Sequence, residues 1–233
     1  MTFEFIGGGL PCFESAATKE YLLKWGIIPS HRIYRFRSSE SIAECRKESF
    51  LKSFLSSAAV RECLKGSQFD DDEPTFNELR RSEASLRMFN RLIAEDIVSD
   101  SKYIRGKIES YLGSFPIGDY LLEALLCSDS DKFLIFSESE RKEVIFRVLK
   151  HLYVGTGYHQ REASIEHLIE VTRLFLKNLL SVVKNDSGDL EIKTLIFEIK
   201  SDTQNDDMSF RYIFFDPFTR EVILWFFDHN KIW

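Results

Sequence analysis

The sequence feature that most constrains the fold is a change of hydrophobic period near residue 185. Before this point most apolar residues recur at helical spacing, and after it they alternate or form short continuous runs, which is typical of buried strands. The three runs are LEIKTLIFEIK, SFRYIFFDP and REVILWFFDH. Only the segment from Asp216 to Arg220 separates the last two runs, so we expect them to form a hairpin. The C-terminal part of the chain therefore predicts an antiparallel sheet.

Two further strands are predicted near the N-terminus. Residues Thr2 to Ile6 alternate and stop at three successive glycines, Gly7 to Gly9, where a turn is expected. The segment from Arg32 to Arg37 places Tyr34 and Phe36 on one face, and this aromatic face is expected to point into the core.

Helical spacing accounts for most of the chain between these strands. Gly26 is placed to end the first predicted helix, and Asp119 to begin a short apolar one. Ser137 and Glu140 have the spacing of a capping box, with Gly155 and Gly157 ending the helix behind it. The predicted helical segments are 15–25, two short helices in 44–64, 86–93, 97–112, a short helix after residue 119, 137–152 and 162–183. The segment 162–183 is predicted to be the longest. Pro116 and Gly118 are expected to end the segment 97–112.

These elements predict the α+β class: a mainly helical middle packed on an antiparallel sheet that the C-terminal strands form together with the N-terminal strands. An apolar content of 44% and an aromatic content of 14% favour one folded domain over residues 1–233. The segment 67–76 contains four successive acidic residues followed by Pro74, and it is the predicted subdomain boundary.

Charge and composition exclude several classes of function. A net charge of −6 and a pI of about 5.5 argue against a nucleic-acid partner and against continuous binding to an acidic lattice. Charged residues interrupt every apolar run before it reaches roughly 18 residues, so membrane insertion is not expected. The cysteines Cys12, Cys45, Cys63 and Cys127 show no paired spacing, which favours reduced thiols in the cytosol.

One pattern has the residue types of a metal-dependent nuclease. Glu198 and Lys200 share a strand face, and Asp186 precedes them by about a dozen residues, so that carboxylates could hold a metal while the lysine stabilises charge. Alternating polar residues on the solvated face of an antiparallel strand produce the same pattern, and this structural interpretation is favoured.

A second pattern could ligate a metal. His159, Glu162 and Glu166 fall at helical spacing with His167 beside them, although acidic residues in a first turn are also explained by the helix dipole. His151 is interpreted as a partly buried structural histidine, since no nucleophile signature accompanies it. Because structural interpretations are favoured for both polar patterns, no metal is expected. No phosphate-binding motif follows the three N-terminal glycines, so no cofactor is expected either.

Three blocks of sequence carry a resemblance to a known family. They are FNRLIAEDIVSDSKYI, SDSDKFLIFSESERKEVIFRVLKHLYVGTG and FRYIFFDPFTREVILWFF. Together they extend from Phe89 to Phe227 and resemble the cilia- and flagella-associated protein 300 family. Before Arg80 the similarity is one of outline, through LLKWGI and FLKSFL.

The resemblance implies a non-enzymatic protein of the cytoplasm and of the cilium or flagellum, including its axoneme. It implies support for the assembly, or the delivery by intraflagellar transport, of outer and inner dynein arms. The implied partners are dynein assembly factors, axonemal dynein subunits or both. No catalytic residue comes with the resemblance. A structural axonemal component is the alternative, and a metal-dependent hydrolase using Glu198 and Lys200 is a remote one.

Partner contacts are expected from aromatic side chains and from the acidic loop. The C-terminal segment is unusually apolar, and an acidic loop could dock a basic partner surface. The predicted partner-binding residues are Trp225, Phe227, Ile232, Trp233, Asp70, Asp71 and Asp72.

Overall fold

The computed structural model describes residues 1–42, 46–65, 74–113, 115–155, 161–200 and 209–228, and the chain divides into two compact units. Unit 1 contains Met1–Phe13, Pro29–Leu79 and Leu179–Trp233, and unit 2 contains Glu14–Ile28 and Arg80–Asn178. Each unit is thus built from stretches that are distant in sequence. One domain over residues 1–233 stays a prediction, and the predicted subdomain boundary at 67–76 lies in unit 1, shortly before the chain enters unit 2 at Arg80.

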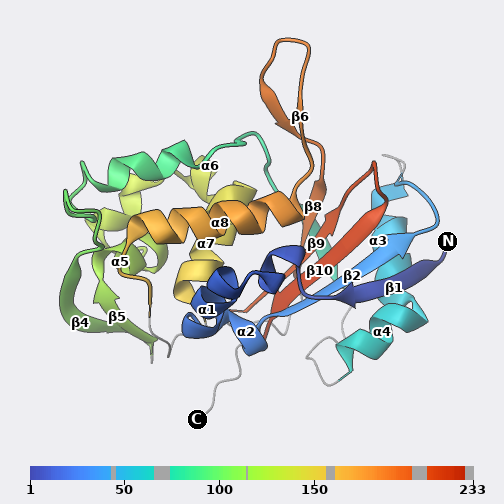
Figure 1. The fold of residues 1–233 in the computed structure, drawn as a ribbon, viewed down its shortest axis with the longest axis horizontal. Coiled ribbons are helices and arrows are strands. Elements are labelled where there is room, and N and C mark those ends of the chain that lie inside the picture. Colours follow the sequence, from blue (N-terminus) through green and yellow to red (C-terminus); the bar gives the residue numbers. More distant parts are fainter. Residues whose placement is uncertain (43–45, 66–73, 114, 156–160, 201–208, 229–233) are drawn as a thin grey trace. The chain divides into compact units, whose positions relative to one another are not determined.

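Unit 1 is organised around an antiparallel sheet whose described strands follow the order β1-β2-β10-β9-β8-β3 (Figure 1). β1 and β3 therefore lie at its edges. The strands are β1 (Phe3–Gly8), β2 (Arg32–Ser38), β3 (Thr75–Glu78), β8 (Leu195–Lys200), β9 (Phe210–Phe215) and β10 (Glu221–Phe227). The predicted α+β class is confirmed, and so is the joining of N-terminal and C-terminal strands in one sheet.

Two short helices, α3 (Lys47–Ser56) and α4 (Ala58–Leu64), cover one face of this sheet (Figure 1). Phenylalanine rings fill the core between them: Phe54 contacts Phe3 with ring centroids 5.1 Å apart and Phe36 with centroids 5.2 Å apart. Edge-to-face pairs of this kind add to the hydrophobic stabilisation of a core. The prediction of two helices here is confirmed, as is the aromatic core face of β2, since Phe36 is buried and Tyr34 packs against the same core.

A hairpin of β6 (Val182–Lys184) and β7 (Leu190–Ile192) projects from unit 1 (Figure 1). The helix predicted over residues 162–183 is therefore shorter than expected, and α8 covers Ile165–Leu179. The backbone N–H of Ser181 donates to Thr194 Oγ1 at 2.8 Å. This tertiary contact, followed by two β-branched valines, turns the chain out of the helix.

Unit 2 is mainly helical. Its described elements are α1 (Ala16–Lys24), the 3-10 helix η3 (Leu86–Leu92), β4 (Gly106–Leu112), β5 (Phe115–Asp119), α5 (Tyr120–Leu126), the 3-10 helix η4 (Asp131–Ile135), α6 (Glu138–Arg141), α7 (Val144–Val154) and most of α8. Two short elements, the 3-10 helix η1 (Pro11–Glu14) and α2 (Ile27–Ser30), lie where the chain passes from one unit to the other. Asp119 caps α5 as predicted, because its Oδ1 accepts the N–H of Leu122 at 2.8 Å.

The helix predicted over residues 97–112 is wrong, because its second half forms the hairpin of β4 and β5. Ile104, Ile108 and Leu112 recur every four residues, a spacing that puts side chains on one side of a helix and also on one face of a strand. Gly106 disfavours the helix, and Gly113 takes a φ of 62° in the turn that follows. Pro116 and Gly118, expected to end a helix, lie within β5 instead.

The helix predicted over residues 137–152 consists of two helices. The capping box of Ser137 and Glu140 is present as predicted, but it begins the four-residue α6. The backbone is extended at Glu143, and α7 starts after it. The side chain of Glu143 accepts hydrogen bonds from Ser82 Oγ and from the backbone N–H of Glu83, so tertiary contacts interrupt the helix.

Two expectations from composition can be compared with the described residues. Within these residues no helix has both the length and the apolar character needed to cross a membrane. Cys12, Cys63 and Cys127 form no disulfide bond, while Cys45 lies outside the described ranges.

Candidate functional site

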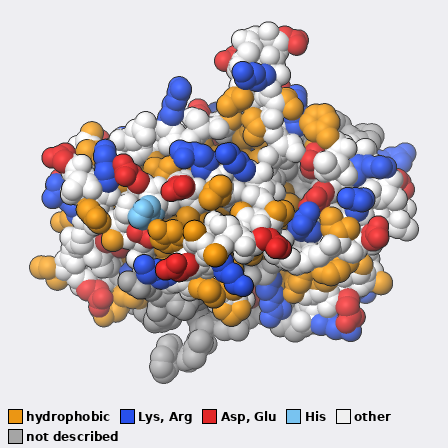
Figure 2. All heavy atoms as spheres, viewed as in Figure 1, with side chains coloured by type: hydrophobic (Ala, Val, Ile, Leu, Met, Phe, Trp, Pro, Cys, Tyr) orange, Lys and Arg blue, Asp and Glu red, His pale blue; other side chains and the backbone are white. Residues whose placement is uncertain are grey.

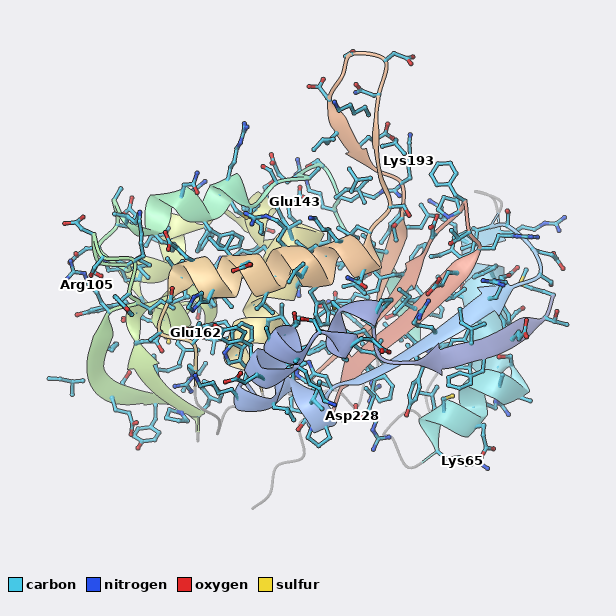
Figure 3. All side chains as sticks on the ribbon, in the orientation of Figure 1. Lys65, Arg105, Glu143, Glu162, Lys193 and Asp228 are labelled. Atoms are coloured by element: carbon cyan, nitrogen blue, oxygen red, sulfur yellow. The ribbon has the colours of Figure 1, made fainter. Side chains whose placement is uncertain are left out.

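Two of the predicted partner-binding residues are buried in unit 1. Trp225 is 0% exposed and Phe227 is 6% exposed. The ring of Trp225 lies 4.8 Å from that of Phe210, and the ring of Phe227 lies 4.9 Å from that of His31. Just after β10, Asp228 (labelled in Figure 3) accepts a 3.0 Å hydrogen bond from Arg211 Nη2. In this conformation both aromatic residues are core residues, and their predicted partner contacts stay a prediction.

The remaining predicted partner-binding residues, Ile232, Trp233, Asp70, Asp71 and Asp72, lie outside the described residues.

The residues of the hydrolase hypothesis have structural contacts. Lys200 Nζ lies 3.9 Å from Glu198 Oε2, and Glu198 is the less exposed of the two. Asn77 of β3 stands opposite Glu198 in the sheet, and Asp186 is exposed in the turn between β6 and β7. The pair is an ion pair on adjacent positions of one strand face, which is the structural interpretation favoured by the sequence.

The second metal pattern is only partly described, since His159 lies outside the described residues. Glu162 Oε1 accepts the backbone N–H of Ser164 at 2.9 Å and lies 3.7 Å from His167 Nδ1. Glu166 is exposed on α8, and His151 is buried in α7. Across the described ranges, no three His, Cys, Asp or Glu side chains are grouped to hold a metal ion.

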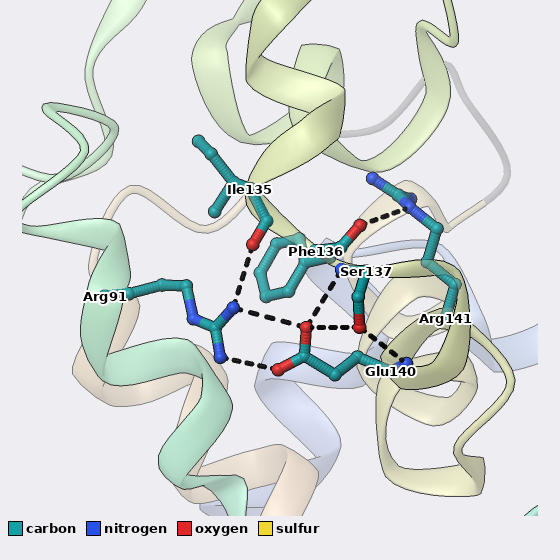
Figure 4. A network of polar contacts seen from close by, with 6 residues as sticks. All are labelled: Arg91, Ile135, Phe136, Ser137, Glu140 and Arg141. Carbon is teal, nitrogen blue, oxygen red and sulfur yellow. Dashed lines mark hydrogen bonds and ion pairs between the residues drawn. The ribbon is translucent and has the colours of Figure 1, made fainter.

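A polar network in unit 2 joins η3 to the segment before α6 (Figure 4). Arg91 Nη2 lies 2.5 Å from Glu140 Oε1, and Arg91 Nη1 donates to the carbonyl oxygen of Ile135 at 2.9 Å. Glu140 Oε2 also accepts the N–H and the hydroxyl of Ser137, each at 2.9 Å. One carboxylate therefore closes the capping box and holds the arginine of a second element.

Arg141 extends this network on the other side of α6. Its Nη2 donates to the carbonyl oxygens of Ala124, at 2.7 Å, and of Phe133. Its guanidinium lies 3.4 Å from the centroid of the Phe133 ring, a cation–π contact. Burial lowers the pKa of Arg141 to about 10, against the opposing effect of the Glu140 charge. The network orders the chain from η4 to α6 and carries no arrangement typical of catalysis.

The tight turn between β9 and β10 in unit 1 is held by the side chain of Asp216. Asp216 Oδ1 accepts the N–H of Phe218 at 2.8 Å, and Asp216 Oδ2 accepts the hydroxyls of Thr219 at 2.9 Å and Ser181 at 2.7 Å. Burial alone would raise the pKa of Asp216, but these hydrogen bonds outweigh it and hold the pKa below its ordinary value. Asp216 therefore fixes the turn and joins it to the base of the β6–β7 hairpin.

This turn displays Phe218, whose side chain is 65% exposed. Val182 and Leu190 on the attached hairpin are 43% and 53% exposed. We call these three residues the Phe218 surface. Figure 2 shows hydrophobic side chains gathered at the base of the projecting hairpin. An exposed aromatic side chain held on a rigid turn is typical of a protein-binding surface, because little conformational entropy is lost when it is covered.

A model of the family described as "Cilia- and flagella-associated protein 300" matches residues 1–227 of this chain. The chain belongs to this family. A relative from Paramecium tetraurelia with the same name is 24% identical over 92% of this chain and 88% of its own length. A relative from Chlamydomonas reinhardtii, also of that name, is 22% identical over 98% of this chain and 99% of its own length. No solved structure matches the chain.

Membership of the cilia- and flagella-associated protein 300 family makes this chain a protein associated with cilia and flagella. The resemblance inferred from the three sequence blocks is confirmed, and the match also includes the N-terminal residues that resembled the family only in outline.

The Phe218 surface of this family member was missed at the level of sequence. The signal was present in the segment Asp216-Pro217-Phe218-Thr219, where an aromatic residue stands inside a turn between two strands. A side chain at the tip of such a turn has no neighbouring strand to cover it.

Proposed function

We propose that this protein supports the assembly of outer and inner axonemal dynein arms, or their delivery by intraflagellar transport, in the cytoplasm and the cilium. It would act by binding dynein assembly factors or axonemal dynein subunits and not by catalysis. The observation that carries the proposal is membership of the cilia- and flagella-associated protein 300 family over residues 1–227.

The two carboxylates that sequence patterns marked for chemistry have structural partners. Glu198 is paired with Lys200, and Glu162 holds the backbone N–H of Ser164. Both carboxylates therefore have contacts within the protein that account for their positions.

The Phe218 surface is the partner contact that we assign to this function. It combines Phe218, on the turn between β9 and β10, with Val182 and Leu190 on the strands of the β6–β7 hairpin. Lys184 pairs with Leu190 in that hairpin, and Arg220 follows Phe218 by two residues. Apolar residues within a polar surround are the usual composition of a binding hot spot.

Capture of partners from ciliating cells tests both parts of the proposal. Tagged wild-type protein is expected to capture dynein subunits or dynein assembly factors, identified by mass spectrometry. Phe218→Ser is expected to reduce that capture about tenfold, because most of the energy of an interface comes from a few buried aromatic contacts. Leu134→Ser is the matched control, since Leu134 is 75% exposed and lies in unit 2.

Two results would count against the proposal in different ways. Capture by Phe218→Ser equal to that of the control would remove the Phe218 surface and leave the function. A wild-type capture without any dynein-arm or assembly protein would remove the function. Fractionation separates the assembly factor from a structural axonemal component, because an assembly factor should be largely extracted with detergent and a structural component should stay on salt-washed axonemes.

A further inference from the structure

The outer edge of β4 is the most exposed apolar strand edge of unit 2. β4 pairs with β5 in a two-stranded ribbon, and no other described strand pairs with it. Ile108 is 92% exposed, Tyr111 is 65% exposed and Leu112 is 44% exposed. Two-stranded ribbons are marginally stable alone, and an unpaired edge offers its N–H and C=O groups to another strand.

An irregular register sets the position of Ile108. Gly106 pairs with Asp119 and Ser110 pairs with Ile117, so four steps along β4 match two along β5. The extra residues form a bulge with Ile108 at its centre. Bulges re-aim side chains and disturb backbone pairing, so a partner at this edge must be selected by side chains as well as by the backbone.

The charges around Ile108 are self-complementary. Lys107 and Glu109 flank it in the sequence, and in an antiparallel pair of β4 strands centred on Ile108, each Lys107 stands opposite the Glu109 of the other strand. Lys107 Nζ already lies 2.8 Å from Glu123 Oε2, and an ammonium group has three donors, so it can hold both carboxylates. The hydroxyl of Tyr111 donates to Glu109 Oε1 and holds that carboxylate.

We propose that β4 binds the β4 strand of a second copy of this chain, antiparallel and with the two-fold axis at Ile108. The two ribbons then form one four-stranded sheet with the order β5-β4-β4-β5, in which the Ile108 side chains contact each other at the axis. Each contact between a residue i of one copy and a residue j of the other then occurs twice, with the two copies exchanged, as a two-fold interface requires. The pair uses few residues, whereas stable interfaces bury roughly 1,200–2,000 Å², so we expect a weak dimer with a micromolar dissociation constant.

Sedimentation equilibrium of the full chain tests the proposal. The wild-type protein is expected to dimerise with rising concentration, and Ile108→Ser is expected to raise the dissociation constant at least about tenfold. The folded state should survive, because Ile108 is almost fully exposed. Leu134→Ser, which alters another exposed apolar residue of unit 2, should dimerise as the wild type does.

Charge reversal identifies the proposed register. Glu109→Lys alone and the double variant Lys107→Glu/Glu123→Lys should each be monomeric, because like charges then face each other. The double variant keeps the ion pair between positions 107 and 123. An equimolar mixture should form a heterodimer, because each lysine again faces a glutamate.

Three results would overturn the proposal. The first is a wild-type chain that stays monomeric at about 100 μM, well above a micromolar dissociation constant. The second is an Ile108→Ser variant that dimerises as tightly as Leu134→Ser. The third is a mixture of the charge variants that stays monomeric. The proposed dimer does not rest on the proposed function in dynein-arm assembly. A failure of the dimerisation test would leave that function standing, and a failure of the capture test would leave the dimer standing.

Discussion

Gly155 shows how closely one position can be constrained. It ends α7 with a φ of 54° and a ψ of −136°, a conformation that residues with a Cβ rarely adopt. A Cβ built at this position would lie 2.4 Å from the carbonyl oxygen of Trp25, a backbone atom that cannot move aside alone. The glycine is therefore needed both for its own conformation and for the close approach of the segment that follows α1.

Replacing Gly155 by alanine is expected to destabilise unit 2 by at least about 2 kcal/mol, because steric overlap adds to backbone strain. Gly113→Ala is the control: Gly113 also has a positive φ, but a Cβ there would meet nothing within 4 Å, so only strain of about 1 kcal/mol is expected. Urea unfolding followed by circular dichroism measures both. Equal losses for the two variants would contradict the contact with Trp25.

Single residues were the most predictable level of this fold. Gly26, Gly155, Asp119 and the pair of Ser137 and Glu140 all take the capping roles that the sequence indicated. These roles depend on local geometry, which a short stretch of sequence determines. Phe218 and Ile108 were not predicted as exposed, because exposure depends on which distant segments cover a residue.

At the level of elements, the errors have two physical causes. A spacing of four residues satisfies both helical and strand periods, and so β4 was predicted as a helix. Tertiary hydrogen bonds interrupted two predicted helices, at Glu143 and at Ser181. Two of the three C-terminal strands, β9 and β10, were predicted correctly, because their continuous apolar runs are too short for helices and are bounded by turn residues. The first run, LEIKTLIFEIK, is divided: Leu195–Lys200 forms β8 of the sheet, and Leu190–Ile192 forms β7 of the separate hairpin with β6.

The network centred on Glu140 links three elements, and it predicts a pH dependence. Burial alone would raise the pKa of Glu140, but hydrogen bonds from Ser137 and the ion pair with Arg91 outweigh it and lower the pKa below its ordinary value of 4.5. A carboxyl whose pKa is lowered in the folded state stabilises that state above its ordinary value. This stabilisation is lost as the pH falls below 4.5 and through the folded value.

Glu140→Gln removes the charge and keeps the shape of the side chain. At about pH 7 it is expected to lower the free energy of unfolding by about 1 kcal/mol, and at about pH 3 the difference from the wild type should shrink towards zero. Urea unfolding at both pH values measures this. Glu166→Gln, at an exposed position on α8, controls for the loss of a negative charge. A difference that stays constant with pH would contradict a stabilising role for the charge of Glu140.

The whole molecule is the level at which sequence reasoning was least complete. The α+β class, and the sheet that N-terminal and C-terminal strands form together, followed from the order of the periodic segments. The chain passes between the two units at four points, and the sequence patterns indicated no boundary at three of them. Only the passage from Leu79 to Arg80 lies near a predicted boundary. Contacts between distant residues decide such a division, and periodicity does not report them.

The function of the whole molecule is inferred from its family and not from an arrangement of catalytic residues. The match over residues 1–227 makes the chain a member of a family associated with cilia and flagella. The structural roles of Glu140, Asp216 and Glu198 are consistent with a protein that acts through its surfaces.

The central claim is that dynein arms fail to assemble or arrive without this protein. The measurement that tests it most directly is the number of outer and inner arms in axoneme cross-sections, by electron microscopy, after deletion of the gene in a ciliate or flagellate. Axonemes of normal length that lack both sets of arms, and regain them with the wild-type gene, are the predicted result. Axonemes that keep their arms, in cells that swim normally, would contradict the claim.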